Sequence, residues 1–191
     1  MSGPLRGKAL LEVIDLCLRE GASIEIDGLG SFQLEREQVV FQPNDRIRVF
    51  LAYAQEDRAA VKKLYRALEK AGFEPWMDQE KLLPGQNWPR AIERAIELSD
   101  FFLGCFSRRS AFKHGHFQCE LRYALEVAGR TPLENIFLVP VRLNECEMPR
   151  HIANHVQYVD LFPNHERGIA KLVKMMRREA SERKRRQKLA S

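Results

Sequence analysis

The stretch Arg48-Val49-Phe50-Leu51-Ala52-Tyr53-Ala54-Gln55-Glu56-Asp57 sets the fold of this chain. Its apolar first half predicts a strand over residues 47–53, and Asp57 can cap the helix that follows. That helix ends at Gly72 and has a core face of Val61, Leu64, Leu68 and Ala71. We therefore expect the strand and the helix to open a series of β-α units.

The chain beyond Gly72 repeats this alternation of strands with helices of about 10–15 residues. Further strands are predicted over residues 73–77, 100–107, 136–142 and 156–160. A loop over residues 78–87 precedes a helix with Pro89 in its first turn, and a final helix begins near His165. The pattern is typical of an α/β domain with a five-stranded parallel sheet flanked by helices.

Glu120 is the first candidate for a functional residue. It lies in the run His114-Gly115-His116-Phe117-Gln118-Cys119-Glu120-Leu121-Arg122-Tyr123, where an amphipathic helix begins after the third strand and extends to about Val127. This position places a carboxylate over the crevice at the carboxyl ends of the strands, where open α/β sheets bind ligands. A glutamate near a helix start is also commonly just a favourable partner of the helix dipole.

The first 43 residues form a separate small α+β module. Apolar residues recur at helical spacing over residues 5–19, and Gly21 follows as a stop. Short alternating segments over residues 23–26, 31–34 and 39–42 predict three strands in a meander. We place the domain boundary at Pro43-Asn44-Asp45.

The net charge of +5 is concentrated at the carboxyl terminus. From residue 174 onward there are eight Lys or Arg residues against two Glu, whereas residues 1–173 are close to neutral. The run 183–188 could touch nucleic acid or anionic lipid, but a solvated, fraying helix end is the commoner origin of such a terminus. We therefore define residues 177–191 as a basic tail and expect truncation after Met176 to leave activity largely unchanged.

Cysteine usage and hydropathy favour a cytoplasmic protein. The four cysteines show no Cys-x-x-Cys spacing and are expected to be reduced structural thiols, with Cys119 a packing residue. His114, His116 and Cys119 lack the fourth ligand of a usual zinc site, so no metal is expected. The chain contains no apolar run long enough to cross a bilayer, and we expect no membrane contact.

Three stretches in order resemble the Toll/interleukin-1 receptor (TIR) domain, over residues 46–176. They are the opening strand with its acidic helix start, the run 76–88, and Gln118-Cys119-Glu120-Leu121. The run 76–88 is similar to the BB loop of the family and carries Asp78, Leu82, Pro84 and Gly85 at the matching positions. The third stretch is similar to the glutamate motif of prokaryotic TIR domains that cleave NAD+. The resemblance implies a flavodoxin-like fold.

The same resemblance implies an NAD+ hydrolase or cyclase with Glu120 as the catalytic carboxylate and NAD+ as substrate rather than cofactor. Breaking the nicotinamide–ribose bond creates positive charge on the ribose, which a nearby carboxylate stabilises. The expected substrate-binding residues are Tyr53 and Trp88, which could stack on the cationic ring, together with His116 and Asp78. His116 replaces a Trp common in NAD-cleaving members, and Ala52 and Ala54 replace the usual serines. The product, ADP-ribose or a cyclised form, stays open.

The resemblance also implies signalling by self-association, as a homo-oligomer or filament, in bacterial anti-phage defence or cell suicide. The BB loop would act as a lid that a neighbouring protomer restrains. The alternative is a non-catalytic TIR adaptor that signals through homotypic contacts. These two classes differ in one observable, the consumption of NAD+.

The amino-terminal module is similar to the helix and hairpin of histone-like HU/IHF proteins. Gly28-Leu29-Gly30-Ser31-Phe32 and Val40-Phe41-Gln42-Pro43 carry the likeness. The long basic DNA-binding arm of that family is replaced by residues 33–39, which hold one Arg and two Glu, and this argues against DNA binding by the module. We interpret residues 1–43 as an assembly module whose helix face contains Leu10, Val13, Ile14 and Cys17.

Overall fold

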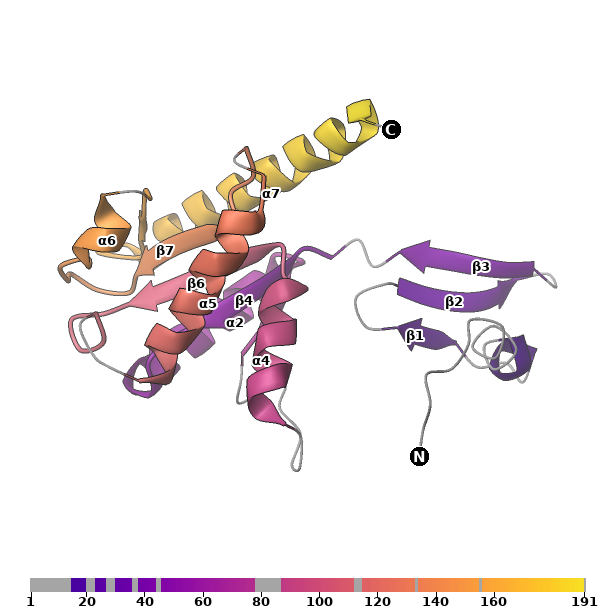
Figure 1. The fold of residues 1–191 in the computed structure, drawn as a ribbon, viewed down its shortest axis with the longest axis horizontal. Helices are drawn as coiled ribbons and strands as arrows, with labels where there is room; N and C mark the ends of the chain where they lie inside the picture. The colour runs from indigo at the N-terminus through magenta and orange to yellow at the C-terminus, as the bar shows by residue number, and fades with distance from the viewer. Residues whose placement is uncertain are drawn as a thin grey trace. The chain divides into compact units, whose positions relative to one another are not determined.

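The computed structural model describes residues 15–19, 23–26, 30–35, 38–43, 46–77, 87–111, 115–132, 134–154 and 156–190. The chain divides into two compact units, Met1–Arg46 and Ile47–Ser191. Each unit has its own sheet, one of three strands and one of five. The two are described separately (Figure 1).

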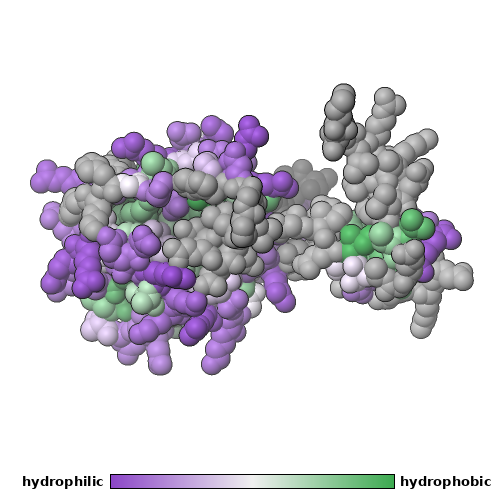
Figure 2. Space-filling view, turned by 90° about the horizontal axis from the view of Figure 1, so that it is seen from below, coloured by the Kyte–Doolittle hydropathy of each residue, from purple (hydrophilic) through white to green (hydrophobic). Residues whose placement is uncertain are grey.

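The smaller unit contains an antiparallel sheet in the order β1-β2-β3, with strands Ile24–Ile26, Gly30–Glu35 and Gln38–Pro43. Of the predicted helix over residues 5–19, residues 15–19 are helical and the rest lies outside the described residues. Leu34 pairs with Val39 across β2 and β3, and their side chains are 39% and 48% exposed. Hydrophobic side chains of this unit therefore reach the surface, as the green atoms in Figure 2 show.

The larger unit contains a parallel sheet in the order β5-β4-β6-β7-β8. Its strands are Arg48–Ala52, Glu74–Trp76, Phe101–Phe106, Leu138–Arg142 and Val159–Asp160, numbered β4 to β8. In sequence order this is 2-1-3-4-5, the strand order of flavodoxin-like folds. The predicted α/β fold with a five-stranded parallel sheet is thus confirmed.

Two helical layers cover the sheet because side chains alternate along its strands. On β4, Val49 and Leu51 face one core cluster, whereas Phe50 and Ala52 face the other. Helices α2 (Arg58–Lys70) and α7 (His165–Ala190) contribute to the first cluster. Helices α4 (Trp88–Glu97), α5 (His116–Arg130) and the short α6 (Arg150–Ala153) contribute to the second. A 3-10 turn, η1 (Gln55–Asp57), links β4 to α2.

Helix α5 packs against β6 at Gly104. A Cβ at Gly104 would lie 3.6 Å from Leu121 Cδ1 and 3.2 Å from Phe106 Cε2. Phe117 packs edge-on against Phe106, with ring centroids 5.1 Å apart. This packing fixes which face of α5 is buried and, as a result, which residues face outward.

Helix α7 continues to Ala190, so residues 177–190 belong to this helix and are not a separate tail. Its second half packs through a polar cluster rather than through apolar residues. Glu179 is 5% exposed, and its Oε1 accepts hydrogen bonds from Arg183 Nε at 3.0 Å and Arg186 Nη2 at 3.0 Å. The sequence pattern missed this contact because apolar periodicity does not report a buried ion cluster.

The same cluster joins α7 to the amino ends of two strands. Glu179 Oε1 also accepts a hydrogen bond from the Ile136 amide, just before β7. Arg183 donates to the backbone carbonyls of Asp100 and Ile136 and lies 4.7 Å from the centre of the Phe101 ring, at the start of β6. Arg183 and Arg186 are therefore structural residues.

Candidate functional site

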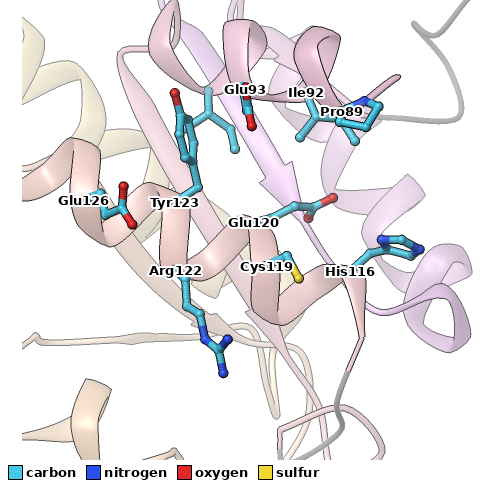
Figure 3. Close-up of a pocket in the computed structure, with 10 residues that line it drawn as sticks. Pro89, Ile92, Glu93, His116, Cys119, Glu120, Arg122, Tyr123 and Glu126 are labelled. Carbon is cyan, nitrogen blue, oxygen red and sulfur yellow. The ribbon is translucent and has the colours of Figure 1, made fainter. Parts of the chain in front are cut away.

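A groove of about 400 Å³ lies between α4 and α5. Its lining residues come from these two helices: Pro89, Ile92, Glu93 and Ile96 from α4, and His116, Cys119, Glu120, Arg122, Tyr123 and Glu126 from α5. Figure 3 shows the Glu120 side chain directed from α5 toward α4, between Tyr123 and His116. The sequence-predicted carboxylate therefore lines a cavity.

The helices hold this arrangement because each buries its opposite side in the same core cluster. Ile92 and Ile96 anchor α4, and the Oδ1 atom of Asn87 caps it by accepting from the Arg90 amide at 3.3 Å. Phe117, Leu121 and Ala124 anchor α5. Glu120 is adjacent to Leu121, about 100° around the helix, and so faces the gap between the helices. It is partly buried there.

Carboxylates dominate the charge of the groove. Glu93, Glu120 and Glu126 line it, against Arg122 and His116. The apolar part of the wall is formed by Pro89, Ile92 and Ile96. An acidic groove with an apolar wall suits a flat ligand that carries positive charge.

Tyr123 connects the two helices at the groove. Its hydroxyl donates a hydrogen bond of 2.6 Å to Glu97 Oε1 on α4. This hydrogen bond, with smaller contributions from burial and from the charges of Glu97 and Glu93, raises the pKa of Tyr123 to about 12. The phenol is thus a neutral donor across the physiological pH range.

All four cysteines are free thiols, as the sequence predicted, but their surroundings differ. Burial raises the pKa of the Cys105 and Cys146 thiols, which stay protonated at neutral pH. Cys119 is exposed and lines the groove, so the expectation that it is a packing residue was wrong.

A buried hydrogen-bond network lies where β4 and β6 end. Asp57 is 7% exposed, and its Oδ2 accepts a hydrogen bond of 2.7 Å from Ser107 Oγ. Ser110 Oγ accepts from the Ser107 amide at 3.0 Å. The Asp57 side chain makes no cap to α2, contrary to the sequence prediction, because it is directed at Ser107. The network ties the start of α2 to the segment that leads toward α5.

The structure brings together some of the predicted site residues and separates others. Glu120 and His116 both line the groove. Tyr53 is 9% exposed and belongs to the core cluster on the opposite face of the sheet, so it is a core residue rather than a stacking platform in the groove. Trp88 begins α4, but its side chain is not described. The loop residues Asp78, Leu82, Pro84 and Gly85 lie outside the described residues.

The sequence did not predict that four further residues line the groove: Ile92, Glu93, Tyr123 and Glu126. Helical spacing held a signal for two of them. Tyr123 is three residues after Glu120 and Glu126 is three residues after Tyr123, so each is a neighbour of the one before it along α5. The α4 residues could not be found this way, because only the tertiary structure shows that α4 is the neighbour of α5.

Residues 49–173 match the family described as TIR domain. The chain belongs to the TIR family. This family includes NAD+ hydrolases, and TIR domains self-associate and can bind NAD+. The resemblance to the TIR domain is thereby confirmed.

The chain is also similar to individual proteins. An uncharacterized protein of Sinorhizobium fredii is 27% identical over 116 residues, which are 61% of this chain and 18% of that protein. The chain therefore matches less than a fifth of that relative. The TIR domain of the Toll-related receptor TRR-2 from Hydra magnipapillata is 25% identical with a TM-score of 0.52, covering 66% of this chain and 97% of that one. A prokaryotic SEFIR domain, 16% identical with a TM-score of 0.52 and covering 68% of this chain and 98% of its own, shares the fold.

The likeness of the first 43 residues to HU/IHF proteins is not supported by these comparisons. The short hairpin motifs that suggested it are common to many small antiparallel sheets. In the described part of the chain, no helix is both long enough and apolar enough to cross a membrane.

Proposed function

We propose that this TIR domain cleaves NAD+ at the bond between nicotinamide and ribose, with Glu120 as the catalytic carboxylate. The observation that carries the proposal is the position of Glu120 in an acidic groove with an apolar wall, within the stretch 118–121 that resembles the glutamate motif of the family. The substrate offers the complementary feature, a flat pyridinium ring with a positive charge.

The reaction requires little from the protein beyond electrostatics. When the bond from C1′ of the ribose to the pyridinium nitrogen breaks, its electron pair stays on nitrogen and nicotinamide leaves as a neutral molecule. The ribose becomes an oxocarbenium-like cation, which the negative charge of Glu120 stabilises. Water then adds to C1′ and releases a proton, or an adenine nitrogen of the same molecule adds and closes a ring. No general acid is needed for the leaving group.

His116 supplies a second polar group at the same site. It is the first residue of α5, is exposed, and lines the groove beside Glu120. An imidazole at this position can stack on a ring or hydrogen-bond a ribose hydroxyl. We assign it to substrate binding rather than to bond cleavage.

We further propose that self-association activates the enzyme and that the amino-terminal unit contributes to it. The exposed Leu34 and Val39 form a cross-strand pair on one face of the β1-β2-β3 sheet, and Leu16 is 61% exposed. Apolar pairs of this kind are suited to burial against a second copy. Association of this unit raises the effective concentration of the TIR domains, to the order of millimolar for a short linkage.

The test is NAD+ turnover by the full chain and by two matched variants. Glu120→Gln keeps the side-chain volume and removes the charge, and we expect it to lose more than about nine-tenths of the rate, equivalent to at least about 1.4 kcal/mol. Glu126→Gln removes a charge from the same groove and should keep most of the rate. Nicotinamide release is followed by chromatography and folding by circular dichroism.

Three results would overturn the assignment. Equal losses in both variants would mean that the overall charge of the groove matters rather than Glu120. Full activity of a folded Glu120→Gln variant would exclude Glu120 as the stabilising group. A wild-type chain that assembles but releases no nicotinamide would favour the non-catalytic adaptor.

A further inference from the structure

The outward face of α7 has an unusual distribution of charge. Six positions, 167, 171, 174, 178, 185 and 188, recur at intervals of three, four or seven residues and therefore lie along one side of the helix. All six are basic and exposed: Arg167, Lys171, Lys174, Arg178, Arg185 and Lys188. We call this set the basic stripe. It extends over about 30 Å at 1.5 Å per residue.

The basic stripe excludes the residues of α7 that face the rest of the protein. Arg183 and Arg186 bind Glu179 and the ends of β6 and β7, so they are not available to a partner. Leu172 and Met176 are buried in the core on the same inward side. Glu182 lies at the edge of the stripe, where its Oε1 is 2.8 Å from Arg178 Nε. Glu182, four residues after Arg178 and three before Arg185, is the one acidic residue along the stripe between Arg167 and Lys188.

This arrangement opposes the stability of the helix alone. Like charges three and four residues apart, such as Arg167, Lys171 and Lys174, repel one another. Arg167 lies in the first turn, where the helix dipole disfavours positive charge. A solvated helix face normally mixes both signs, which relieves the repulsion. A bound polyanion would relieve it here.

We propose that the basic stripe binds the phosphate backbone of double-stranded nucleic acid without reading its sequence. A single row of cations about 30 Å long runs beside roughly nine phosphates of one strand, at 3.4 Å per phosphate. The stripe carries no aromatic residue on which unpaired bases could stack, which favours a duplex over a single strand. Arg and Lys side chains that contact phosphates position a duplex and do not specify a sequence.

A membrane is the less suitable occupant. Helices that lie on bilayers insert an apolar face between the lipids, but the apolar face of α7 is buried against the sheet. Leu189 is 88% exposed but follows the last cation of the stripe, and one leucine is a weak anchor. The proposal is independent of NAD+ cleavage, because the groove is lined by α4 and α5 on the other face of the sheet.

The experiment measures binding of the full chain to a labelled random-sequence duplex by fluorescence anisotropy, between about 50 and 200 mM salt. Six phosphate contacts predict a slope of about −5 for the logarithm of the association constant against the logarithm of salt concentration. The triple variant Lys171→Gln, Lys174→Gln and Arg185→Gln should reduce that slope by about half. Each of the three single variants should reduce it by about one.

The matched control removes the same charge elsewhere. Arg94, Arg130 and Arg150 are exposed and lie on α4, α5 and α6, and their joint replacement by Gln should leave the slope unchanged. Equal weakening by the control would show a net-charge effect and overturn the proposal. So would an unchanged slope in the stripe variants, an absence of duplex binding at the lowest salt, or binding to vesicles of anionic lipid without binding to the duplex.

Discussion

The role of the Asp57 side chain depends on its neighbours in the folded structure. It sits at the start of α2, where a carboxylate usually caps the helix, yet its side chain accepts a hydrogen bond from Ser107 across 50 residues of sequence. The carboxylate is almost fully buried, so its one hydroxyl donor matters. Burying a charged acceptor without its donor is costly.

We expect Ser107→Ala to lower the free energy of unfolding by about 1.5–3 kcal/mol, because it leaves the Asp57 carboxylate buried without that donor. Denaturant unfolding monitored by circular dichroism measures the change. Ser181→Ala is the control, since Ser181 is exposed and bonds only the carbonyl one turn earlier in α7, and it should change stability by less than about 0.5 kcal/mol. Identical midpoints for Ser107→Ala and wild type would show that the network is not stabilising.

Tyr123 allows a direct test of the α4–α5 contact through its titration. Its pKa is raised to about 12, first by the hydrogen bond to Glu97. A raised folded-state pKa means that this contribution to stability is fully present below the unfolded pKa of about 10 and is lost as pH rises toward 12.

The difference in phenolate absorbance between wild type and Tyr123→Phe should therefore have a midpoint near pH 12. Spectrophotometric titration with circular dichroism as a folding control makes the measurement. Replacing Glu97 with Gln should move that midpoint down, because the charged acceptor is gone. A midpoint near the ordinary value of about 10 in folded wild type would contradict the contact.

At the level of elements, α7 is the helix whose role changes most between sequence and structure. Its first half packs through Leu172 and Met176, and its second half through Glu179 with Arg183 and Arg186. The expectation that truncation after Met176 is tolerated no longer follows. The truncation removes Glu179 and Arg183, which hydrogen-bond the backbone of Asp100 and Ile136.

We expect Glu179→Ala to lower the free energy of unfolding by about 3–5 kcal/mol, because two arginines and the Ile136 amide lose a buried acceptor. The truncation after Met176 should be destabilised at least as much. Thermal melting followed by circular dichroism measures both. The control, Glu182→Gln, removes an exposed acid of the same helix and should melt at the wild-type temperature; a similar loss there would contradict a specific role for Glu179.

At the level of the whole molecule, the function we propose depends on assembly as well as on the groove. The amino-terminal unit presents Leu34 and Val39 to solvent as neighbours on adjacent strands. We propose this pair as part of the surface through which copies associate. Of the helix face expected from sequence, Leu10, Val13 and Ile14 lie outside the described residues, and Cys17 is partly exposed.

We expect the specific activity of the wild type to rise with protein concentration and Val39→Lys to shift that rise to higher concentration. A lysine in a surface that becomes buried on association carries an unpaired charge into it. Light scattering and nicotinamide release at matched concentrations make the measurement. Gln38→Lys adds the same charge to the adjacent, exposed position of β3, whose side chain points to the opposite face, and should change neither curve. A constant specific activity in a monomeric wild type would show that the domain works alone.

The sequence alone determined the element order, the parallel sheet and the place of Glu120 on α5. These features follow from local signals: apolar runs for buried strands, 3.6-residue periodicity for helices, and glycine or proline at their ends. Each is set within a window of about 15 residues, so no knowledge of neighbours is needed. The family resemblance adds the expectation that residues 78–88 form a BB loop, again from contiguous residues.

Only the tertiary structure decided which groups face one another. It placed Tyr53 in the core on the face away from the groove, turned Asp57 toward Ser107, and joined Glu93 of α4 to the groove of Glu120. It packed the partly buried Arg183 against a carbonyl 83 residues away and left the six cations of the basic stripe exposed. The physical reason is that these outcomes depend on which side of the sheet each helix covers. Long-range packing decides which side each helix covers, and the periodicity of the sequence does not report it.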